Sequence, residues 1–353
     1  MKNKIISLTL IFVILASTLS LYSCSGSEPP EKFTAHSLEL FDTATTITGY
    51  EQDEETFKTV SDGILEELEE YHKLYDIYTR YDGISNLCTV NDVVDGAHKE
   101  VQVDEKIIDM LLYAKAMYRA TDGAVNVAMG SVLSIWHSYR TAGLDEPWAA
   151  ELPPMEMLTE AAEHTSIDDV IIDEEASTVF LADPEMSLDV GAIAKGYATE
   201  MVAQSLEEQG ISGYVINVGG NVRTVGYKYE KERWTAGVEN PDRDSEEAYL
   251  VYLEIAGESV VTSGSYQRFY TVGDKDYHHI IDPQTLMPSE RYLSVTVVCE
   301  DSAQGDGLST ALFCMSLEDG RMLVEQTPGV EAMWILPDGT QHISSAFNGY
   351  VKE

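Results

Sequence analysis

The stretch DVGAIAKGY, residues 189–197, lies where a predicted strand passes into a predicted helix that runs from about Ala192 to Gln209. Its small residues would let a ligand come close to the backbone, and the free N–H groups at a helix start favour anionic oxygen. Lys195 adds a cation in the first turn of this helix. In the alternative interpretation the glycines serve packing in a tight turn, and Lys195 is a solvated side chain. The spacing of the residues leaves both interpretations open.

The segments on either side of this stretch indicate an α+β fold with mixed sheets and flanking helices. Helices gather in the first half of the chain, and strands mixed with helices fill the second half. The predicted elements are helices over 57–75, from 104, over 192–209, over about 306–315 and around 322, hairpins over 170–181 and 333–339, and strands at 214–217, 250–255, 259–262 and 293–299. No linker follows residue 30, so residues 36–353 are expected to form a single unit.

The chain is strongly acidic. Its 353 residues include 22 Lys and Arg against 61 Asp and Glu, which gives a formal net charge of −39. Such a surface repels phosphate backbones, so nucleic acid is not expected as a partner. An anionic cofactor would need a local device, such as a divalent cation, helix N-termini or a few placed cations.

The N-terminus is typical of an exported lipoprotein. Two lysines precede an apolar run over residues 5–21, which ends in Leu21-Tyr22-Ser23-Cys24. This pattern predicts a signal peptide over 1–23, lipidation of Cys24 and a tether over 24–35. The alternative is a plain N-terminal membrane anchor, because the apolar run is only slightly shorter than a span. In both cases the folded part lies outside the cytoplasm and is tied to a membrane.

Two glycine-bearing loops follow predicted strands. They read Asn217-Val218-Gly219-Gly220-Asn221 and Thr262-Ser263-Gly264-Ser265. Each permits either a turn or the close approach of a ligand, and neither is decisive alone.

The segment His278-His279-Ile280-Ile281-Asp282-Pro283 ends a predicted strand. Adjacent side chains of a strand point to opposite faces, so at most one of the two histidines can face a given site. The alternative is a histidine whose polar atoms are satisfied beside a turn.

Asp306 and Thr310 stand four residues apart, so on a helix they share one face. A carboxylate and a hydroxyl are hard oxygen ligands, which suit Mg²⁺ better than zinc. In the alternative interpretation Asp306 is an ordinary helix N-cap.

Taken together and in order, eight short segments between about Phe41 and Cys314 resemble the ApbE family of FAD:protein FMN transferases. The segments are 41–43 (FDT), 76–78 (DIY), 121–126 (TDGAVN), 189–197 (DVGAIAKGY), 217–221 (NVGGN), 261–264 (VTSG), 279–283 (HIIDP) and 306–310 (DGLST). The resemblance implies a T-fold-related single catalytic unit that binds FAD and Mg²⁺ and transfers FMN to a Thr or Ser hydroxyl of another protein, with release of AMP.

The same resemblance implies roles for individual residues. His279 matches the base that accepts the proton of the acceptor hydroxyl, and Asp306 is expected to act in catalysis through the metal. The predicted metal ligands are the Ala192 carbonyl, Asp306, Ser309 and Thr310. The predicted FAD-binding residues, with the two glycine-bearing loops included, are Phe41, Tyr78, Ala124, Val125, Asn126, Asp189, Lys195, Gly219, Gly220, Thr262, Ser263, Gly264 and Ile281.

The acceptor is expected to be a second polypeptide, because the sequence holds no flavin-acceptor motif of its own. The resemblance implies an exported or membrane protein, similar to subunits of the Na⁺-pumping NADH:quinone oxidoreductase or of Rnf-type complexes. The enzyme would then work at the outer face of the bacterial cytoplasmic membrane. Two other hypotheses remain at this point: a Mg²⁺-dependent FAD pyrophosphatase that uses water as the acceptor, and a flavin-binding lipoprotein without catalysis.

Overall fold

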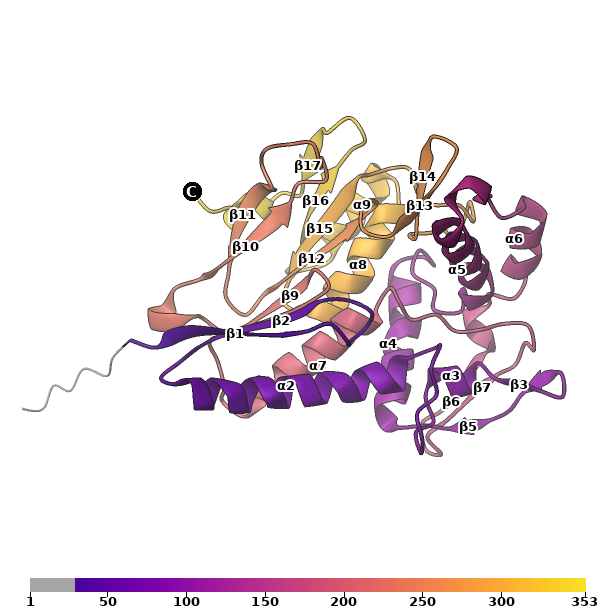
Figure 1. The fold of residues 1–353 in the computed structure, drawn as a ribbon, viewed down its shortest axis with the longest axis horizontal. Coiled ribbons are helices and arrows are strands. Elements are labelled where there is room, and N and C mark those ends of the chain that lie inside the picture. Colours follow the sequence, from indigo (N-terminus) through magenta and orange to yellow (C-terminus); the bar gives the residue numbers. More distant parts are fainter. Residues whose placement is uncertain (1–28) are drawn as a thin grey trace, which may run out of the picture.

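The computed structural model describes residues 29–353 (Figure 1). The predicted signal peptide and the lipidation site Cys24 lie outside the described residues. The first strand, β1 (Glu31–Ser37), pairs antiparallel with β2 (Thr45–Glu51). The strand β1 therefore begins inside the stretch 24–35 that the sequence predicted as a tether.

The centre of the molecule is an eight-stranded sheet in the order β1-β2-β8-β9-β12-β15-β16-β17, in which all neighbours are antiparallel. The remaining strands are β8 (Tyr214–Val218), β9 (Asn221–Val225), β12 (Ser259–Gly264), β15 (Ser294–Cys299), β16 (Glu331–Ile335) and β17 (Gln341–Ile343). All six residues of β15 are buried, because both faces of the sheet are covered.

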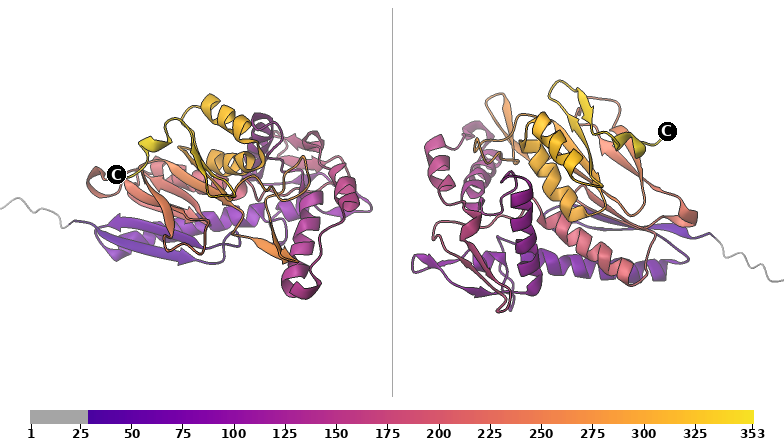
Figure 2. Two further views of the ribbon diagram at one scale, coloured as in Figure 1. Left: turned by 90° about the horizontal axis from the view of Figure 1, so that it is seen from above. Right: turned by 180° about the vertical axis from the view of Figure 1, so that it is seen from behind.

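Helices cover one face of this sheet, as the rear view in Figure 2 shows. They are α2 (Glu54–Tyr75), α7 (Ala194–Glu208), α8 (Ser302–Cys314) and α9 (Leu317–Gln326). The apolar stripe of α2 is buried, as the periodicity of the sequence predicts. The helix start is capped by Asp53. The hairpin β10 (Trp234–Glu239) and β11 (Tyr249–Ile255) packs on the other face, around Trp234, Val260 and Val298.

A second group of elements lies at one end of the sheet (Figure 1). It contains α3 (Leu87–Val90), α4 (Glu105–Ala120), α5 (Gly130–Asp145), α6 (Met155–Ala162), the short hairpin β3 (Val93–Val94) and β4 (Ala97–His98), the sheet β5-β7-β6 (Val101–Gln102, Thr178–Leu181, Val170–Asp173), and the hairpin β13 (Phe269–Val272) and β14 (Lys275–His278). Buried Trp136 of α5 and Tyr270 of β13 share one apolar cluster with Ile281, which follows β14. The predicted α+β architecture is confirmed. Between residues 29 and 353, no helix is both long enough and apolar enough to span a membrane.

The start of α8 differs from the prediction. The sequence suggested a helix from about residue 306, whereas α8 begins at Ser302. The reason is that Asp301 caps the helix: its side chain accepts hydrogen bonds from the backbone N–H groups of Ala303 and Gln304. Asp306 therefore lies in the second turn, and the interpretation of Asp306 as an N-cap is wrong.

Candidate active site

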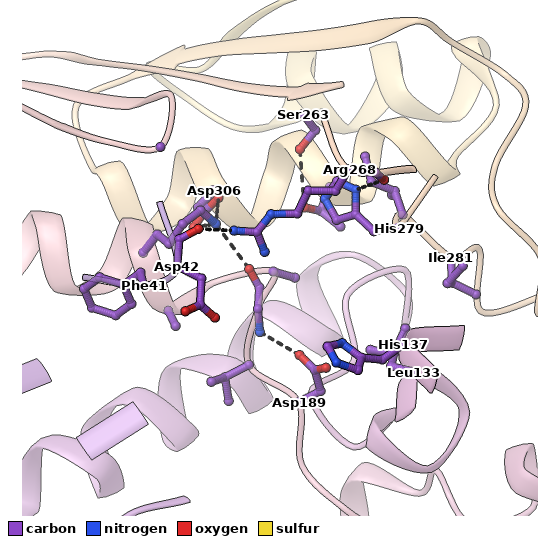
Figure 3. Close-up of a pocket in the computed structure, with 18 of the residues that line it drawn as sticks. Phe41, Asp42, Leu133, His137, Asp189, Ser263, Arg268, His279, Ile281 and Asp306 are labelled. Carbon is purple, nitrogen blue, oxygen red and sulfur yellow. Dashed lines mark hydrogen bonds and ion pairs between the residues drawn. The ribbon is translucent and has the colours of Figure 1, made fainter. Parts of the chain in front are cut away.

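A cavity of about 690 Å³ opens where the sheet end meets the second group of elements (Figure 3). Its walls come from the loop after β1, the chain after α2, the helix α5, the segment 189–195, the ends of β8 and β12, the chain after β14, and α8. Most of these segments are the motifs of the sequence analysis, so residues far apart in the sequence meet in one place. A cavity of this size is typical of a site for a small molecule or a cofactor.

Nearly all of the predicted site residues line this cavity. They are Phe41, Tyr78, Ala124, Val125, Asn126, Asp189, Ala192, Lys195, Gly219, Thr262, Ser263, Gly264, His279, Ile281, Asp306 and Thr310. Gly220 and Ser309 are not part of the wall. The N–H of Gly220 donates to the Asn217 side chain (3.0 Å), so this glycine serves the turn. Ser309 is fully buried, and its hydroxyl lies 2.8 Å from that of Ser263, which does line the cavity.

The Asp306 carboxylate is held by the first turn of α7. Its Oδ2 atom accepts a hydrogen bond from the backbone N–H of Gly196 (2.8 Å) and lies 3.3 Å from Lys195 Nζ. A Cβ atom on Gly196 would overlap Asp306 Cβ and the Ser302 carbonyl. Gly196 therefore allows α7 and α8 to pack closely, which is the packing role that the sequence left open, whereas Gly191 lies on the cavity wall as a ligand-approach role requires.

The ring of His279 is oriented by a backbone carbonyl. The Arg268 carbonyl accepts the backbone N–H of His279 (3.1 Å) and lies 3.2 Å from its Nδ1. Because a carbonyl only accepts, this contact places the proton on Nδ1 and leaves Nε2 free to accept another. Burial, followed by the positive charge of Arg268, lowers the pKa of His279 to about 3, so the ring is neutral near pH 7.

The neighbouring His278 has no free ring nitrogen. Its Nε2 donates to the Ser289 carbonyl (2.8 Å), and its Nδ1 accepts from the Ile280 N–H (3.2 Å). Both histidines line the cavity, and of these two only His279 has a ring nitrogen left to exchange a proton with a bound molecule. Hydrogen bonding, and not the alternation of strand side chains, makes the difference.

Comparison with known proteins identifies the family. The model of the ApbE family matches residues 41–334. The chain belongs to the ApbE family. A FAD:protein FMN transferase of Klebsiella pneumoniae (strain 342) is 35% identical over 272 residues, which are 74% of this chain and 81% of that protein. The resemblance predicted from the motifs is therefore confirmed.

Two solved structures share the fold. The ApbE protein of Thermotoga maritima has a TM-score of 0.78 at 28% identity and covers 92% of this chain and 100% of its own. The flavin transferase ApbE of Vibrio cholerae has a TM-score of 0.74 at 27% identity, with 91% and 100% covered. The predicted ApbE-like fold is confirmed.

Two arginines of this ApbE site, Arg140 and Arg268, are not part of any of the sequence motifs. Arg268 Nη2 donates to the Asp42 carbonyl (2.8 Å), while Arg140 Nη2 lies 3.2 Å from Nδ1 of His137. Burial and the nearby Arg268 lower the pKa of Arg140. Arg268 follows the VTSG motif by four residues and could have been suspected, since cations are scarce in this chain. Arg140 lies in a helix without a motif, so only the fold reveals it.

The loop that carries Phe41 and Asp42 has an unusual backbone. Both residues have φ near +52°, a left-handed conformation that costs energy for any residue but glycine. The turn is held by the Thr43 N–H, which donates to the Leu40 carbonyl, and by the Phe41 N–H, which donates to Nδ1 of His72. Its result is that the Asp42 carbonyl faces Arg268, so the strained loop fixes the guanidinium at the cavity.

The oxygen ligands present fit Mg²⁺ better than a transition metal. Asp306, Thr310 and Ala192 line one wall and supply a carboxylate, a hydroxyl and a carbonyl. Between residues 29 and 353 there is no group of three or more His, Cys, Asp or Glu residues that could hold a metal. A site with one carboxylate suits Mg²⁺, which keeps several waters and binds substrate phosphates. Asn221 also lines the cavity, and its buried amide nitrogen has no hydrogen-bond partner among residues 29–353.

Proposed function

We propose that this ApbE-family enzyme transfers FMN from FAD to a Thr or Ser hydroxyl of another protein, with Mg²⁺ bound at Asp306, and releases AMP. The Klebsiella pneumoniae relative is a FAD:protein FMN transferase and the Vibrio cholerae structure is a flavin transferase, and this chain is a transferase of the same kind. One observation carries the proposal: a single cavity combines a buried carboxylate beside a lysine with a histidine whose Nε2 is free. Charge stabilisation at phosphorus and a base for the attacking hydroxyl are what such a transfer requires.

The pyrophosphate of FAD would be held by the three cations of the cavity, Lys195, Arg140 and Arg268. They matter because the net charge of −39 would otherwise repel this anion. Arg268 is fixed by the Asp42 carbonyl, and Lys195 donates to the Gly191 carbonyl (3.3 Å) as well as facing Asp306. Both cations are therefore oriented before the substrate arrives, which reduces the cost of binding.

Asp306, Thr310 and the Ala192 carbonyl would hold Mg²⁺. When bound, the ion supplies neutralisation of the pyrophosphate and stabilisation of the AMP leaving group. Contacts within the protein position these oxygens. The Gly196 N–H fixes one oxygen of Asp306, and Thr310 lies one turn further along the same face of α8.

His279 would accept the proton of the acceptor hydroxyl at Nε2, while its Nδ1–H continues to donate to the Arg268 carbonyl. In the free protein its pKa of about 3 makes it a weak base. Because Arg268 is a cause of this low value, a pyrophosphate beside Arg268 would offset the positive charge and raise the pKa of His279. The base would thus become effective when FAD is bound.

The decisive assay mixes the protein, FAD, Mg²⁺ and an exported acceptor that carries a Thr flavinylation motif. The acceptor is then weighed by mass spectrometry, and AMP is quantified. A heavier acceptor and AMP in equal amounts, both abolished by a chelator, support the proposal. AMP and free FMN produced at equal rates with or without acceptor would mean a pyrophosphatase, and bound but uncleaved FAD would mean a carrier.

We also propose that a lipid on Cys24 holds the enzyme at the outer face of the cytoplasmic membrane, near exported acceptors of the kind found in Na⁺-pumping NADH:quinone oxidoreductase or Rnf-type complexes. The motif Leu21-Tyr22-Ser23-Cys24 supports this location. Wild-type protein should sediment with membranes and carry the lipid, and Cys24→Ala should lose it. Wild-type protein that is soluble and uncut would contradict the proposal.

A further inference from the structure

The helices α7 and α8 exchange two matching hydrogen bonds. The Gly196 N–H of α7 donates to Asp306 Oδ2 of α8 (2.8 Å), and the Ser302 N–H of α8 donates to Glu200 Oε2 of α7 (2.8 Å). Gly196 and Glu200 are four residues apart, as are Ser302 and Asp306, so the two contacts are one helical turn from each other. We call them the α7–α8 amide–carboxylate pairs.

Both donors lie in the first turn of their helices, where backbone N–H groups have no partner within the helix. Each helix therefore satisfies an unpaired amide with a carboxylate of the other. Together the two contacts fix the register between α7 and α8. The position of Asp306 in the cavity depends on this register, because Asp306 and the first turn of α8 belong to one rigid element.

We infer that Glu200, which does not line the cavity, is a positioning residue for the metal site: it anchors the start of α8 and thereby sets where Asp306 and Thr310 stand. The inference rests on the proposed function, since it assigns Glu200 a part in the binding of Mg²⁺. It adds a residue that none of the sequence motifs contained.

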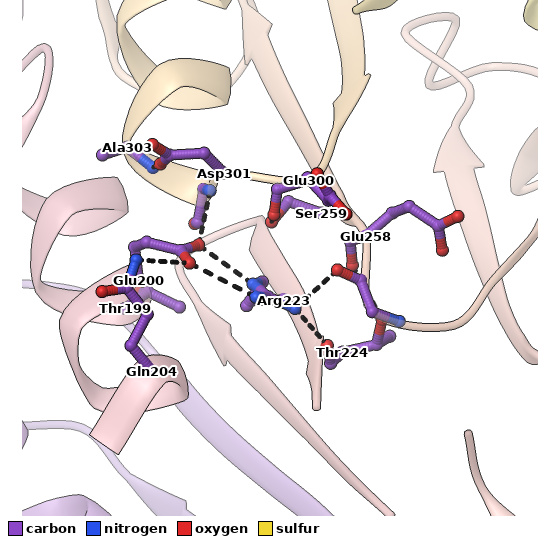
Figure 4. A network of polar contacts seen from close by, with 12 residues as sticks. Thr199, Glu200, Gln204, Arg223, Thr224, Glu258, Ser259, Glu300, Asp301 and Ala303 are labelled. Carbon is purple, nitrogen blue, oxygen red and sulfur yellow. Dashed lines mark hydrogen bonds and ion pairs between the residues drawn. The ribbon is translucent and has the colours of Figure 1, made fainter. Parts of the chain in front are cut away.

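Glu200 can serve as an anchor because it is itself fixed (Figure 4). Arg223 binds both of its oxygens, with Nε 2.9 Å from Oε2 and Nη2 3.3 Å from Oε1. Both side chains are only 4% exposed. Arg223 is held in turn by the Gly257 carbonyl (2.7 Å) and by Glu207 (3.1 Å). The carboxylate of Glu200 therefore has little freedom to follow α8 if the helix shifts.

The start of α8 has further contacts that lead to the cavity. The Ser302 hydroxyl donates to Oδ1 of Asn221, whose side chain lines the cavity. Asp301 accepts from the next two amides of the helix. If Glu200 no longer accepted the Ser302 N–H, this buried amide would lack a hydrogen-bond partner, which is energetically costly. The start of α8 would have to move for the amide to reach another acceptor. Such a movement would carry Asp306 away from Gly196.

The test uses Glu200→Gln with Glu207→Gln as the matched control. Glutamine keeps the size of Glu200 but turns an amide N–H₂ toward the N–H groups of Arg223 or of Ser302. Glu207 also binds Arg223, yet it makes no contact with α8 through a backbone amide. The readouts are hydrogen–deuterium exchange of the segment around Gly196, binding of Mn²⁺ as a substitute for Mg²⁺ in the presence of FAD, and binding of FAD without metal.

We expect Glu200→Gln to lose protection at the Gly196 amide and to bind Mn²⁺ about ten- to a hundred-fold more weakly, as is common for residues that orient metal ligands. FAD binding without metal should be unchanged, and Glu207→Gln should match the wild type in all three measurements. A folded Glu200→Gln protein with a lower melting temperature but wild-type Mn²⁺ affinity and Gly196 protection would overturn the inference.

If Glu200→Gln does not fold, Arg223→Lys provides the second variant, because lysine keeps the charge but cannot bind both oxygens of Glu200. For this variant, too, we expect lower Gly196 protection and weaker Mn²⁺ binding, and wild-type values of both would overturn the inference.

A failure of the proposed function can be distinguished from a failure of this inference. In that case the wild type itself would bind no Mn²⁺ in the presence of FAD, while the exchange experiment would still test whether Glu200 positions Asp306.

Discussion

The cavity wall and the interior directly behind it each contain a carboxylate at the α7–α8 contact, but the two carboxylates differ in how many of their hydrogen-bond sites are already used. Asp306 and Glu200 each accept a backbone amide from the opposite helix at 2.8 Å. Behind the wall, Arg223 binds both oxygens of Glu200, and Gln204 and the Ser302 N–H donate to the same carboxylate, so all of its acceptor sites are used. At the wall, Asp306 faces only Lys195, whose side chain is 25% exposed and can move away. With the same contact to a backbone amide, Glu200 is therefore an anchor for α8, whereas Asp306 still has an oxygen available to a metal ion.

The two histidines repeat this contrast. His278 uses both ring nitrogens on backbone groups, whereas His279 uses one and keeps the other free. A polar group becomes functional here when it is held firmly by some of its bonding sites and left free at another. The comparison predicts that substitutions behind the wall will cost stability and, at Glu200, metal affinity, while those at the wall will cost activity with little loss of stability.

The largest effect on stability is expected from Arg223→Met. It leaves the Glu200 charge buried without its partner, and the loss of one member of a buried ion pair typically costs about 3 to 5 kcal/mol of unfolding free energy. Urea denaturation at neutral pH measures this loss. Replacing both partners, as in Glu200→Leu with Arg223→Met, should recover much of the stability, but not the metal affinity. Recovery of both would contradict the role of Glu200.

The largest effect on activity is expected from Asp306→Asn. Asparagine can still accept the Gly196 N–H, so the unfolding free energy should change by about 1 kcal/mol or less. The metal would lose its only carboxylate, and with several kcal/mol of charge stabilisation lost, FMN transfer should fall about a thousand-fold or more. Transfer assays beside thermal melts separate the two quantities. A folded variant with near wild-type transfer would show that Asp306 serves only the packing of α8 against α7.

A smaller loss of activity is expected from His279→Gln. Removal of a positioned general base commonly costs about a hundred-fold or more in rate, and the fold should persist because the ring lies at the cavity surface. His278→Gln is the matched control: it should lower the melting temperature, while the folded fraction keeps its turnover. Equal losses of turnover in both variants would show that the two rings do not differ in function.

The contrast between wall and interior also explains what the sequence could predict. The motif at 306–310 predicted that Asp306 and Thr310 share a face, because that follows from helical geometry alone. The sequence could not decide whether Gly196 serves packing or the approach of a ligand, because its packing partners Ser302 and Asp306 are more than a hundred residues away.

Arg140 and the pair Arg223–Glu200 were missed for the same reason: a lone charged residue in the sequence is normally solvated, and only the tertiary structure buries it. The start of α8 was misplaced because Asp301 and Asp306 are both suitable caps, and the choice between them is made by contacts with α7.

The smallest expected effect is a difference in pH dependence between wild type and His279→Gln. In the native protein the pKa of His279 is about 3, and in the unfolded chain it is near the ordinary value of 6.5. Below pH 6.5 the unfolded chain therefore takes up a proton that the native protein does not accept until about pH 3, so acidification favours unfolding. His279→Gln removes this contribution to the pH dependence, while the contribution of His278 remains in both proteins.

Urea denaturation from neutral pH down to about pH 4 should show a shallower loss of unfolding free energy in the variant. Saturating FAD should shrink the difference, because a pyrophosphate beside Arg268 raises the native pKa. Identical slopes without FAD would mean that the ring at the cavity wall is as well solvated as in the unfolded chain.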